Sequence, residues 1–182
     1  MSTLNEHVLR PLAAGTRRRP VPPLQRRLAA VMSLDVKGYS LLMGRDDADT
    51  HRRVGAGLTR AIDQIGRHEG RVFSFSGDGL MAEFPSAVKA LLCALRIQAA
   101  NARQHRRQHE RRRIEFRFGV HAGDIVDQDG RAGGDAVNIA ARLEQIAEAG
   151  TIFLSRDVFE LTARVVHSDY AHIGERQLKN IE

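Results

Sequence analysis

The stretch that decides the fold is residues 71–84, which read RVFSFSGDGLMAEF. Two short runs of strand-forming residues, 71–76 and 80–84, are separated by Gly77-Asp78-Gly79. Asp-Gly between two such runs is one of the stronger sequence signals for a β-hairpin. The sequence therefore predicts two antiparallel strands here, with the carboxyl group of Asp78 in the turn between them.

The residues before this hairpin predict a strand and a helix. Residues 28–36 form a short apolar run that is typical of a buried strand, and Asp35 lies at its end. Gly38 then interrupts the pattern. Residues 39–68 have helical spacing, and Gly70 is the expected stop of that helix.

The residues after the hairpin predict a second helix and several shorter elements. Apolar residues at helical spacing follow Pro85 and continue to about residue 99. Residues 114–121 alternate between apolar and polar side chains, as a half-buried strand does, and residues 124–127 are expected to start another strand. The remaining expected elements are a helix that ends near Gly150, a strand at 151–154, a short helix at 156–164 and a strand near 170–173.

This order of elements predicts an α+β fold with a ferredoxin-like βαββαβ core. The sheet is expected to be mostly antiparallel, with helices on one face. A chain of 182 residues is long enough for one such domain but short for two. We expect the domain to occupy residues 27–182, and residues 1–26, which are rich in arginine and proline, to form a flexible basic tail.

The composition excludes several classes of protein. The single cysteine, Cys93, excludes an intrachain disulfide and a cysteine-based zinc site, and its apolar neighbours predict a buried thiol. No apolar run approaches the roughly 18 residues that cross a bilayer, and no secretory signal is recognised, so a cytoplasmic location is expected. The chain has a net charge of +6, and its arginines are concentrated in the tail and in residues 103–113. Neither segment offers an aromatic side chain for base stacking. We therefore expect a solvated cationic surface and no nucleic-acid binding.

Two acidic residues stand at the ends of predicted strands. In a ferredoxin-like order, the strand that ends at Asp35 lies beside the hairpin that carries Asp78, which would bring the two carboxylates together. Mg²⁺ and Mn²⁺ prefer oxygen ligands and bridge phosphate oxygens. Backbone N–H groups after Gly38, where the chain turns helical, could hold a phosphate anion. Each feature also has a purely structural interpretation, because Asp and Gly are common in turns.

A third candidate lies in the sequence GDAVNIAAR at 134–142. Asn138 and Arg142 are four residues apart, so a helix would present them on one face. An amide and a guanidinium on one face suit a ribose and a phosphate, because the geometry of arginine matches phosphate oxygens. A polar stripe that only faces solvent is the alternative interpretation.

Three motifs together resemble the catalytic domain of class III adenylate/guanylate cyclases, and most of all its bacterial branch. They are LDVKGYS at 34–40, SGDGLMAEF at 76–84 and DAVNIAARLE at 135–144. The resemblance spans about residues 27–181 and implies a homodimer with two shared active sites at the interface. One subunit would supply the metal-binding aspartates and the other the asparagine and the arginine. The family usually continues into one more strand, so we expect this domain to lack that strand or to have a short edge.

The resemblance also implies the roles of individual residues. Asp35 and Asp78 would hold two divalent ions, Mg²⁺ or Mn²⁺, and the carbonyl group of Val36 would reach one of them. The residues implied to touch the nucleotide are Gly38, Tyr39, Ser40 and Lys179 along the triphosphate, Asn138 at the ribose and Arg142 at the α-phosphate. The ribose 3′-oxygen would attack the α-phosphorus and expel pyrophosphate, which makes the expected product a 3′,5′-cyclic nucleotide.

The residues that would recognise the base depart from the family pattern. Ser74 occupies the position of a lysine that reads adenine, and Arg131 occupies the position of an aspartate. ATP remains the expected substrate. Two alternatives stay open: a cyclase that uses GTP or a pyrimidine triphosphate, and a catalytically weak cyclase-like dimer that serves as a regulatory module.

Overall fold

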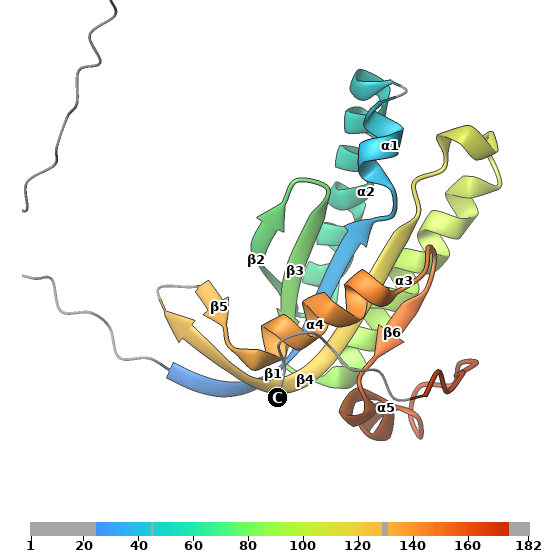
Figure 1. Cartoon of the computed structure of the whole chain (residues 1–182). Helices are drawn as coiled ribbons and strands as arrows, with labels where there is room; N and C mark the ends of the chain where they lie inside the picture. The colour runs from blue at the N-terminus through green and yellow to red at the C-terminus, as the bar shows by residue number, and fades with distance from the viewer. Residues whose placement is uncertain (1–24, 45, 129–130, 175–182) are drawn as a thin grey trace, which may run out of the picture.

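The computed structural model describes residues 25–44, 46–128 and 131–174 (Figure 1). Its strands are β1 (Gln25–Val36), β2 (Arg71–Ser76), β3 (Gly79–Phe84), β4 (Phe116–Gln128), β5 (Arg131–Gly133) and β6 (Ile152–Leu154). Its helices are α1 (Tyr39–Met43), α2 (Asp47–Arg67), α3 (Ala87–His105), α4 (Asp135–Ile146) and α5 (Arg156–Thr162), with a 3₁₀ turn, η1, at Glu110–Arg112.

The strands form one open sheet in the order β2-β3-β1-β4-β5, and β6 pairs with the first half of β4. All these pairs are antiparallel except that of β4 with β6. This is the strand order of a ferredoxin-like core, so the predicted α+β fold is confirmed. β1 is the central strand, and its register places Leu34 opposite both Leu80 and Phe118.

Helices cover both faces of the sheet, which corrects the prediction of helices on one face. Along β1, Met32 and Leu34 belong to the larger apolar core, which also contains residues of α2 and α3. Val31 points to the opposite face, where it packs in a smaller core with Ala136 and Ala140 of α4. Figure 1 shows α4 across the face of the sheet that α2 and α3 do not cover. A strand buried on both faces reads as a continuous apolar run, and residues 29–34 are all buried.

Other boundaries also differ from the prediction. The helix predicted over 39–68 is two helices, because the carboxylate of Asp46 caps α2 by accepting a hydrogen bond from the Asp49 N–H group (3.0 Å). Residues 124–127 do not start a strand but continue β4, which pairs with β1 from residue 116 to residue 127.

The strand predicted near 170–173 is absent from the described part of the chain. Tyr170 is fixed by side-chain contacts instead: its hydroxyl group donates to the Val166 carbonyl (2.9 Å), and its ring packs edge-on against Phe159 (5.3 Å between centroids). The Cys93 thiol is buried as predicted, and this burial raises its pKa to about 12. Residues 1–24, which make up most of the predicted tail, and Lys179 lie outside the described residues.

Helix α4 packs closely against the sheet at Gly119. A Cβ atom at Gly119 of β4 would lie 2.2 Å from the Ala140 carbonyl oxygen and 2.3 Å from the Glu144 backbone nitrogen. These are backbone atoms of α4, so they cannot move aside as a flexible side chain can. The absence of a side chain at residue 119 therefore sets how closely α4 lies against β4.

We expect Gly119→Ala to lower the free energy of unfolding by about 1–3 kcal/mol, because the added methyl group overpacks this contact. Urea denaturation would measure the change. Gly55→Ala is the matched control: nothing lies within 4 Å of a Cβ atom at this position in α2, and loss of a helical glycine is stabilising by about 0.5–1 kcal/mol. A Gly119→Ala protein as stable as the unsubstituted chain would contradict this account of α4.

Candidate active site

The structure brings Asp35 and Asp78 together at one end of β1. Asp35 is the last residue but one of β1, and Asp78 lies in the turn between β2 and β3. A Cβ atom at Gly79 would lie 2.7 Å from the Leu34 carbonyl oxygen and 3.2 Å from Asp35 Oδ1, so the start of β3 touches the end of β1. Gly77 has a φ of 58°, a left-handed conformation that glycine adopts without strain. The hairpin turn thus places the second carboxyl group beside the first.

The two acids influence each other electrostatically. Burial raises the pKa of Asp78 to about 6, and the negative charge of Asp35 adds to this effect. A backbone hydrogen bond and the charge of Arg117 act in the opposite direction. A carboxyl group whose charge is disfavoured by burial and by a neighbouring carboxylate is a suitable place for a cation, which would relieve the repulsion.

The donor atoms at this position fit a hard divalent ion. Both side chains offer carboxylate oxygens, the ligands that Mg²⁺ and Mn²⁺ prefer. Within residues 25–44, 46–128 and 131–174, no group of three or more His, Cys, Asp or Glu side chains could hold a metal ion. Additional ligands would therefore come from backbone carbonyl groups, water or a bound phosphate.

Arg117 is a third charged group at this site, and the sequence analysis missed it. The register of β1 with β4 places Arg117 opposite Asp35, and its Nη2 atom lies 2.7 Å from Asp35 Oδ2. The same guanidinium contacts α4, with Nε 2.7 Å from Glu144 Oε1 and Nη1 donating to the Gln145 carbonyl oxygen (2.9 Å). Residue 117 appeared only as one polar residue of an alternating strand, because the pairing register is not visible in the sequence of a single strand.

Glu144 is also a group that sequence reasoning did not single out. Its side chain is buried, and this burial raises its pKa to about 7, although the Arg117 charge opposes the shift. The charges of Asp35 and Asp78 act in the same direction as burial, and the Ser33 hydroxyl donates to Glu144 Oε2 (3.4 Å). Asp35 and Glu144 therefore both contact Arg117 at the place where β1, β4 and α4 meet, and the charge of Arg117 also acts on Asp78.

The segment after Asp35 is held in a turn by its backbone. Gly38 has a φ of 72°, and its carbonyl oxygen accepts hydrogen bonds from the N–H groups of Leu41 and Leu42 (3.0 and 3.1 Å). Ser40 is exposed, and Tyr39 is half-buried against the larger core. Gly38, Tyr39 and Ser40, the residues expected along the triphosphate, therefore begin three residues after Asp35 in the chain.

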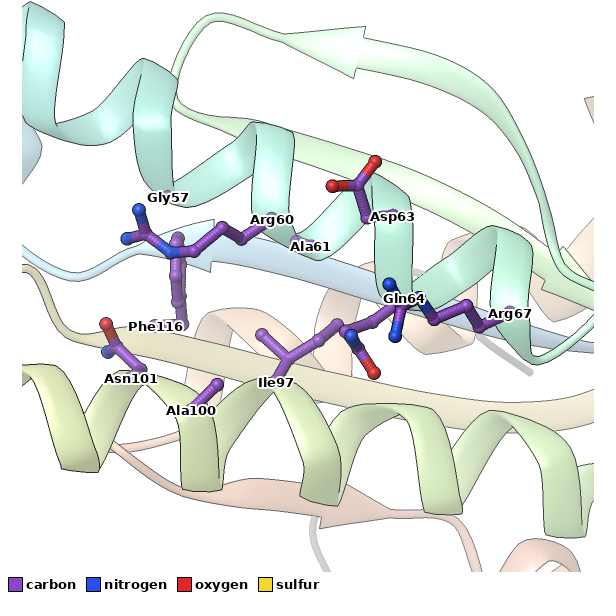
Figure 2. A pocket seen from close by; sticks show the side chains of 10 residues that line it. All are labelled: Gly57, Arg60, Ala61, Asp63, Gln64, Arg67, Ile97, Ala100, Asn101 and Phe116. Carbon is purple, nitrogen blue, oxygen red and sulfur yellow. The ribbon is translucent and has the colours of Figure 1, made fainter.

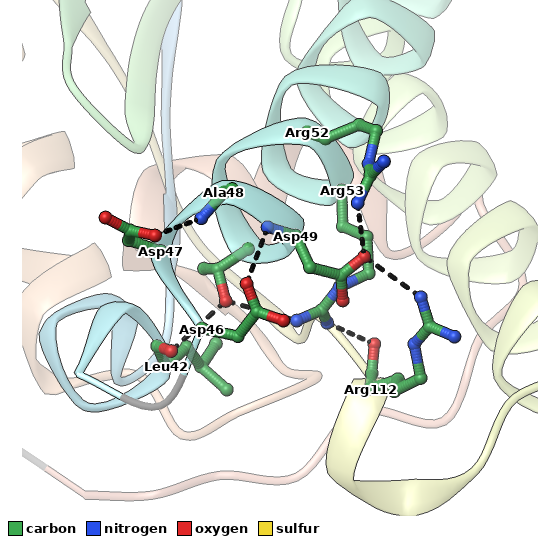
Figure 3. A network of polar contacts seen from close by, with 9 residues as sticks. Leu42, Asp46, Asp47, Ala48, Asp49, Arg52, Arg53 and Arg112 are labelled. Carbon is green, nitrogen blue, oxygen red and sulfur yellow. Dashed lines mark hydrogen bonds and ion pairs between the residues drawn. The ribbon is translucent and has the colours of Figure 1, made fainter.

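A polar network fixes the next turn, between α1 and α2 (Figure 3). The Asp49 carboxylate accepts from Arg53 Nε (2.7 Å) and from Arg112 Nη2 (2.9 Å), and Arg53 also donates to the Arg112 carbonyl oxygen (2.6 Å). Burial alone would raise the pKa of Asp49, but these two guanidinium groups lower it. The network links the beginning of α2 to η1. Helix α1 therefore lies between the hydrogen-bonded turn at Gly38 and the anchored beginning of α2.

Asn138 and Arg142 lie on α4, away from the sheet. Ala136, Ala140 and Leu143 form the buried face of this helix. Asn138 is exposed, and half-buried Arg142 donates to Gln145 Oε1 (3.3 Å). In the described part of the chain, no hydrogen bond or ion pair joins either residue to Asp35 or Asp78. The predicted site residues thus form two groups within one chain: the acid pair and the α4 face.

The two candidate base-reading residues lie on β2 and β5. Ser74 is half-buried and follows a bulge in the pairing of β2 with β3, a feature that redirects side chains. Arg131 begins β5, opposite Gln128. The sheet curls so that β2 contacts β5, and Arg71 of β2 forms an ion pair with Asp127 of β4 (2.8 Å). Both positions therefore belong to strands that meet, although they stand at opposite ends of the strand order.

In the described part of the chain, two hollows lie on the side of the sheet that α2 and α3 cover, and neither is lined by the acid pair. The smaller, about 120 Å³, lies between α2 and α3, with Arg60, Arg67 and Asn101 around it (Figure 2). The larger, about 870 Å³, lies between α3, the beginning of β4 and residues 165–168. The acid pair lies on the opposite side of β1, towards α4.

Comparison with known proteins identifies the family. A solved structure from Silicibacter pomeroyi, described as an adenylate/guanylate cyclase/hydrolase, is 39% identical to this chain and superposes with a TM-score of 0.81. The match covers 88% of this chain and 94% of that one. This chain belongs to the class III adenylate/guanylate cyclase family.

Two further relatives agree with this cyclase fold. The adenylyl cyclase CyaB from P. aeruginosa superposes with a TM-score of 0.75 at 24% identity, over 87% of this chain and 91% of that one. A Rhizobium meliloti protein named "Putative adenylate cyclase 3" is 41% identical over 160 residues, which are 87% of this chain and 27% of that protein. The cyclase domain thus spans about a quarter of this curated relative. No protein-family model matches the chain, and in the described ranges no helix is long and apolar enough to cross a membrane.

The acid pair yields a direct prediction about titration. Asp35→Asn should lower the pKa of Asp78 from about 6, because one of the causes of its elevation is the charge of Asp35. The pKa should remain above the ordinary value, since burial is the larger cause and stays. Carbon-detected NMR of the side-chain carboxyl groups in metal-free protein would measure it. Asp63→Asn, at an exposed position of α2, is the control, and an equal effect of both substitutions would argue against a coupled pair.

Proposed function

We propose that this cyclase domain converts a nucleoside triphosphate, with ATP as the expected substrate, to a 3′,5′-cyclic nucleotide and pyrophosphate. The observation that carries the proposal is the acid pair, Asp35 and Asp78, at the end of the central strand. Membership of the cyclase family supports the reaction, since relatives of this fold are described as adenylyl or guanylyl cyclases.

Asp35, Asp78 and the Val36 carbonyl group would hold the two divalent ions, Mg²⁺ or Mn²⁺. When bound, the ions would favour the deprotonated ribose 3′-oxygen and balance the charge of the phosphates. The backbone of Gly38, Tyr39 and Ser40 would line the triphosphate, which is consistent with their position directly after Asp35. Lys179 would add a positive charge at the far end of the triphosphate.

Asn138 and Arg142 would act on the nucleotide bound by the partner subunit. Their position on α4, without contact to the acids of their own subunit, supports a site that is completed by a second copy. Arg142 would stabilise the negative charge that develops at the α-phosphate, and Asn138 would orient the ribose. No protein nucleophile is needed, because positioning and charge stabilisation account for this class of reaction.

Base selectivity is the part of the proposal with two open alternatives. A hydroxyl group at Ser74 and a guanidinium at Arg131 offer different hydrogen bonds from the lysine and aspartate that read adenine in the family. A guanine or uracil edge presents carbonyl oxygens, which Arg131 could bind, so GTP or a pyrimidine triphosphate is the first alternative. A catalytically weak, dimeric regulatory module is the second, and the replaced base-reading pair favours it.

Incubation of the purified chain with Mn²⁺ or Mg²⁺ and each of ATP, GTP, UTP and CTP would test the proposal. We expect a cyclic nucleotide, identified by mass spectrometry, from at least one triphosphate. Asp78→Asn should abolish the product, whereas Asp63→Asn should leave it unchanged. Absence of product from all four triphosphates would reject the enzyme and favour the regulatory module.

Mixing two inactive variants would test the shared sites. We expect Arg142→Ala to lower kcat by about two powers of ten or more, by analogy with other phosphoryl-transfer arginines. Asp78→Ala should be inactive for a different reason, the loss of a carboxylate. A mixture of the two should regain activity, since a heterodimer contains one site with both residues intact. If the mixture stays inactive while the two variants form heterodimers, each site is built within one subunit.

A further inference from the structure

We propose that Glu144 is a positioning residue for the acid pair: it holds the Arg117 guanidinium on α4, so that Asp35 can take up a divalent ion. This inference rests on the proposed function of Asp35 and Asp78. It assigns a task to two charged side chains that the proposed chemistry does not use.

Arg117 and a metal ion would compete for the carboxylate of Asp35. Arg117 Nη2 lies 2.7 Å and Nε 3.2 Å from Asp35 Oδ2, so this guanidinium already neutralises Asp35. A divalent ion on the same carboxylate would repel the guanidinium, because two positive charges would then lie close together. A carboxylate paired in this way would bind metal less well unless Arg117 can pair with another group.

Glu144 provides that group without binding metal itself. Its Oε1 atom lies 2.7 Å from Arg117 Nε, and the neighbouring Gln145 carbonyl oxygen accepts from Nη1 (2.9 Å). If Arg117 leaves Asp35, it keeps a charged partner and a backbone acceptor on α4. The contacts of the Glu144 carboxylate are with Arg117 and the Ser33 hydroxyl, which is why we assign it to the arginine and not to the ions.

The fold fixes Glu144 in this position. The side chains of Arg117 and Glu144 are 18% and 10% exposed, and a buried carboxylate is costly unless it is paired. The backbone of Glu144 lies against Gly119 of β4. Gly119 is two residues from Arg117 in the same strand, so Glu144 lies near Arg117. The Ser33 hydroxyl, from β1, reaches the other carboxylate oxygen. Three elements thus converge to keep the Glu144 carboxyl group beside Arg117.

The exchange predicts opposite effects for the two partners. Glu144→Gln keeps the size of the side chain but removes its charge, so Asp35 becomes the charged partner that Arg117 retains. Metal binding should then weaken by about tenfold, the order of the loss of one close charged contact. Arg117→Gln should bind metal at least as tightly as the unsubstituted chain, because the metal ion no longer competes with Arg117 for Asp35. The double variant should return to within about threefold of the unsubstituted chain.

Titration of the full chain with Mn²⁺, followed by the electron paramagnetic resonance signal of unbound Mn²⁺, would measure these affinities without turnover. A pH of about 8 keeps Glu144 ionised, since its pKa is about 7. Glu148→Gln is the matched control, with the same charge change at an exposed position just after α4. Thermal unfolding without metal checks that each variant folds. Glu144→Asp, which keeps the charge, should retain affinity within about threefold and replaces Glu144→Gln if that variant does not fold.

Each outcome decides the question. Weaker Mn²⁺ binding by Glu144→Gln that is restored in the double variant supports the exchange, as does recovery of the variant's turnover at saturating Mn²⁺. Equal weakness of the single and double variants would overturn it, because Glu144 would then act on the metal or on the fold. Unchanged affinity in Glu144→Gln would also overturn it. Failure of the unsubstituted chain to bind Mn²⁺ would instead reject the proposed function of the acid pair.

Discussion

The pairing of β1 with β3 on one side and β4 on the other is the constraint on which the site depends. The first pairing brings the β2–β3 turn, with Asp78, to the end of β1, and the second places Arg117 opposite Asp35. A shift of either strand by one residue would turn these side chains to the other face of the sheet. Burial of β1 on both faces opposes such a shift, since Met32 and Val31 are buried in different cores. The charged groups are therefore aligned by apolar packing that they do not take part in.

Burial, to which the charge of Asp35 adds, explains why the pKa shifts of Asp78 and Glu144 have a common sign. Asp35 and Glu144 both contact the guanidinium of Arg117. The raised pKa values of Asp78 and Glu144 reflect burial, to which the charge of Asp35 adds in both cases. A carboxyl group whose pKa is raised on folding destabilises the fold as the pH increases through that pKa. The metal-free protein should therefore lose stability from these two groups between about pH 4 and 7. A bound cation would reverse this loss, which links metal binding to stability.

Much of the fold and one half of the site could be predicted from local sequence. Asp-Gly at 78–79 predicted the hairpin, and the run at 28–36 predicted the buried strand, because turn chemistry and apolar burial act over a few residues. Asp35 and Asp78 were paired through the expected strand order. Arg117 and Glu144 could not be found in this way, since their roles depend on a strand register and on the seating of α4. The position of α4 on the second face depends on Gly119, whose significance appears only when the Ala140 and Glu144 backbones are seen against it.

The separation of the two residue groups within one subunit is itself an argument about assembly. Asp35 is partly exposed on the α4 side of the sheet, while Asn138 projects from the outer face of α4. A side chain on the outer face cannot turn inward without displacing Ala136 and Ala140 from the smaller core. The packing of α4 therefore favours the proposal that the amide and the guanidinium act on a nucleotide held by a second copy of the chain. The packing that keeps Glu144 beside Arg117 also leaves Asn138 exposed on α4. In the proposed dimer, this one helix would serve two sites.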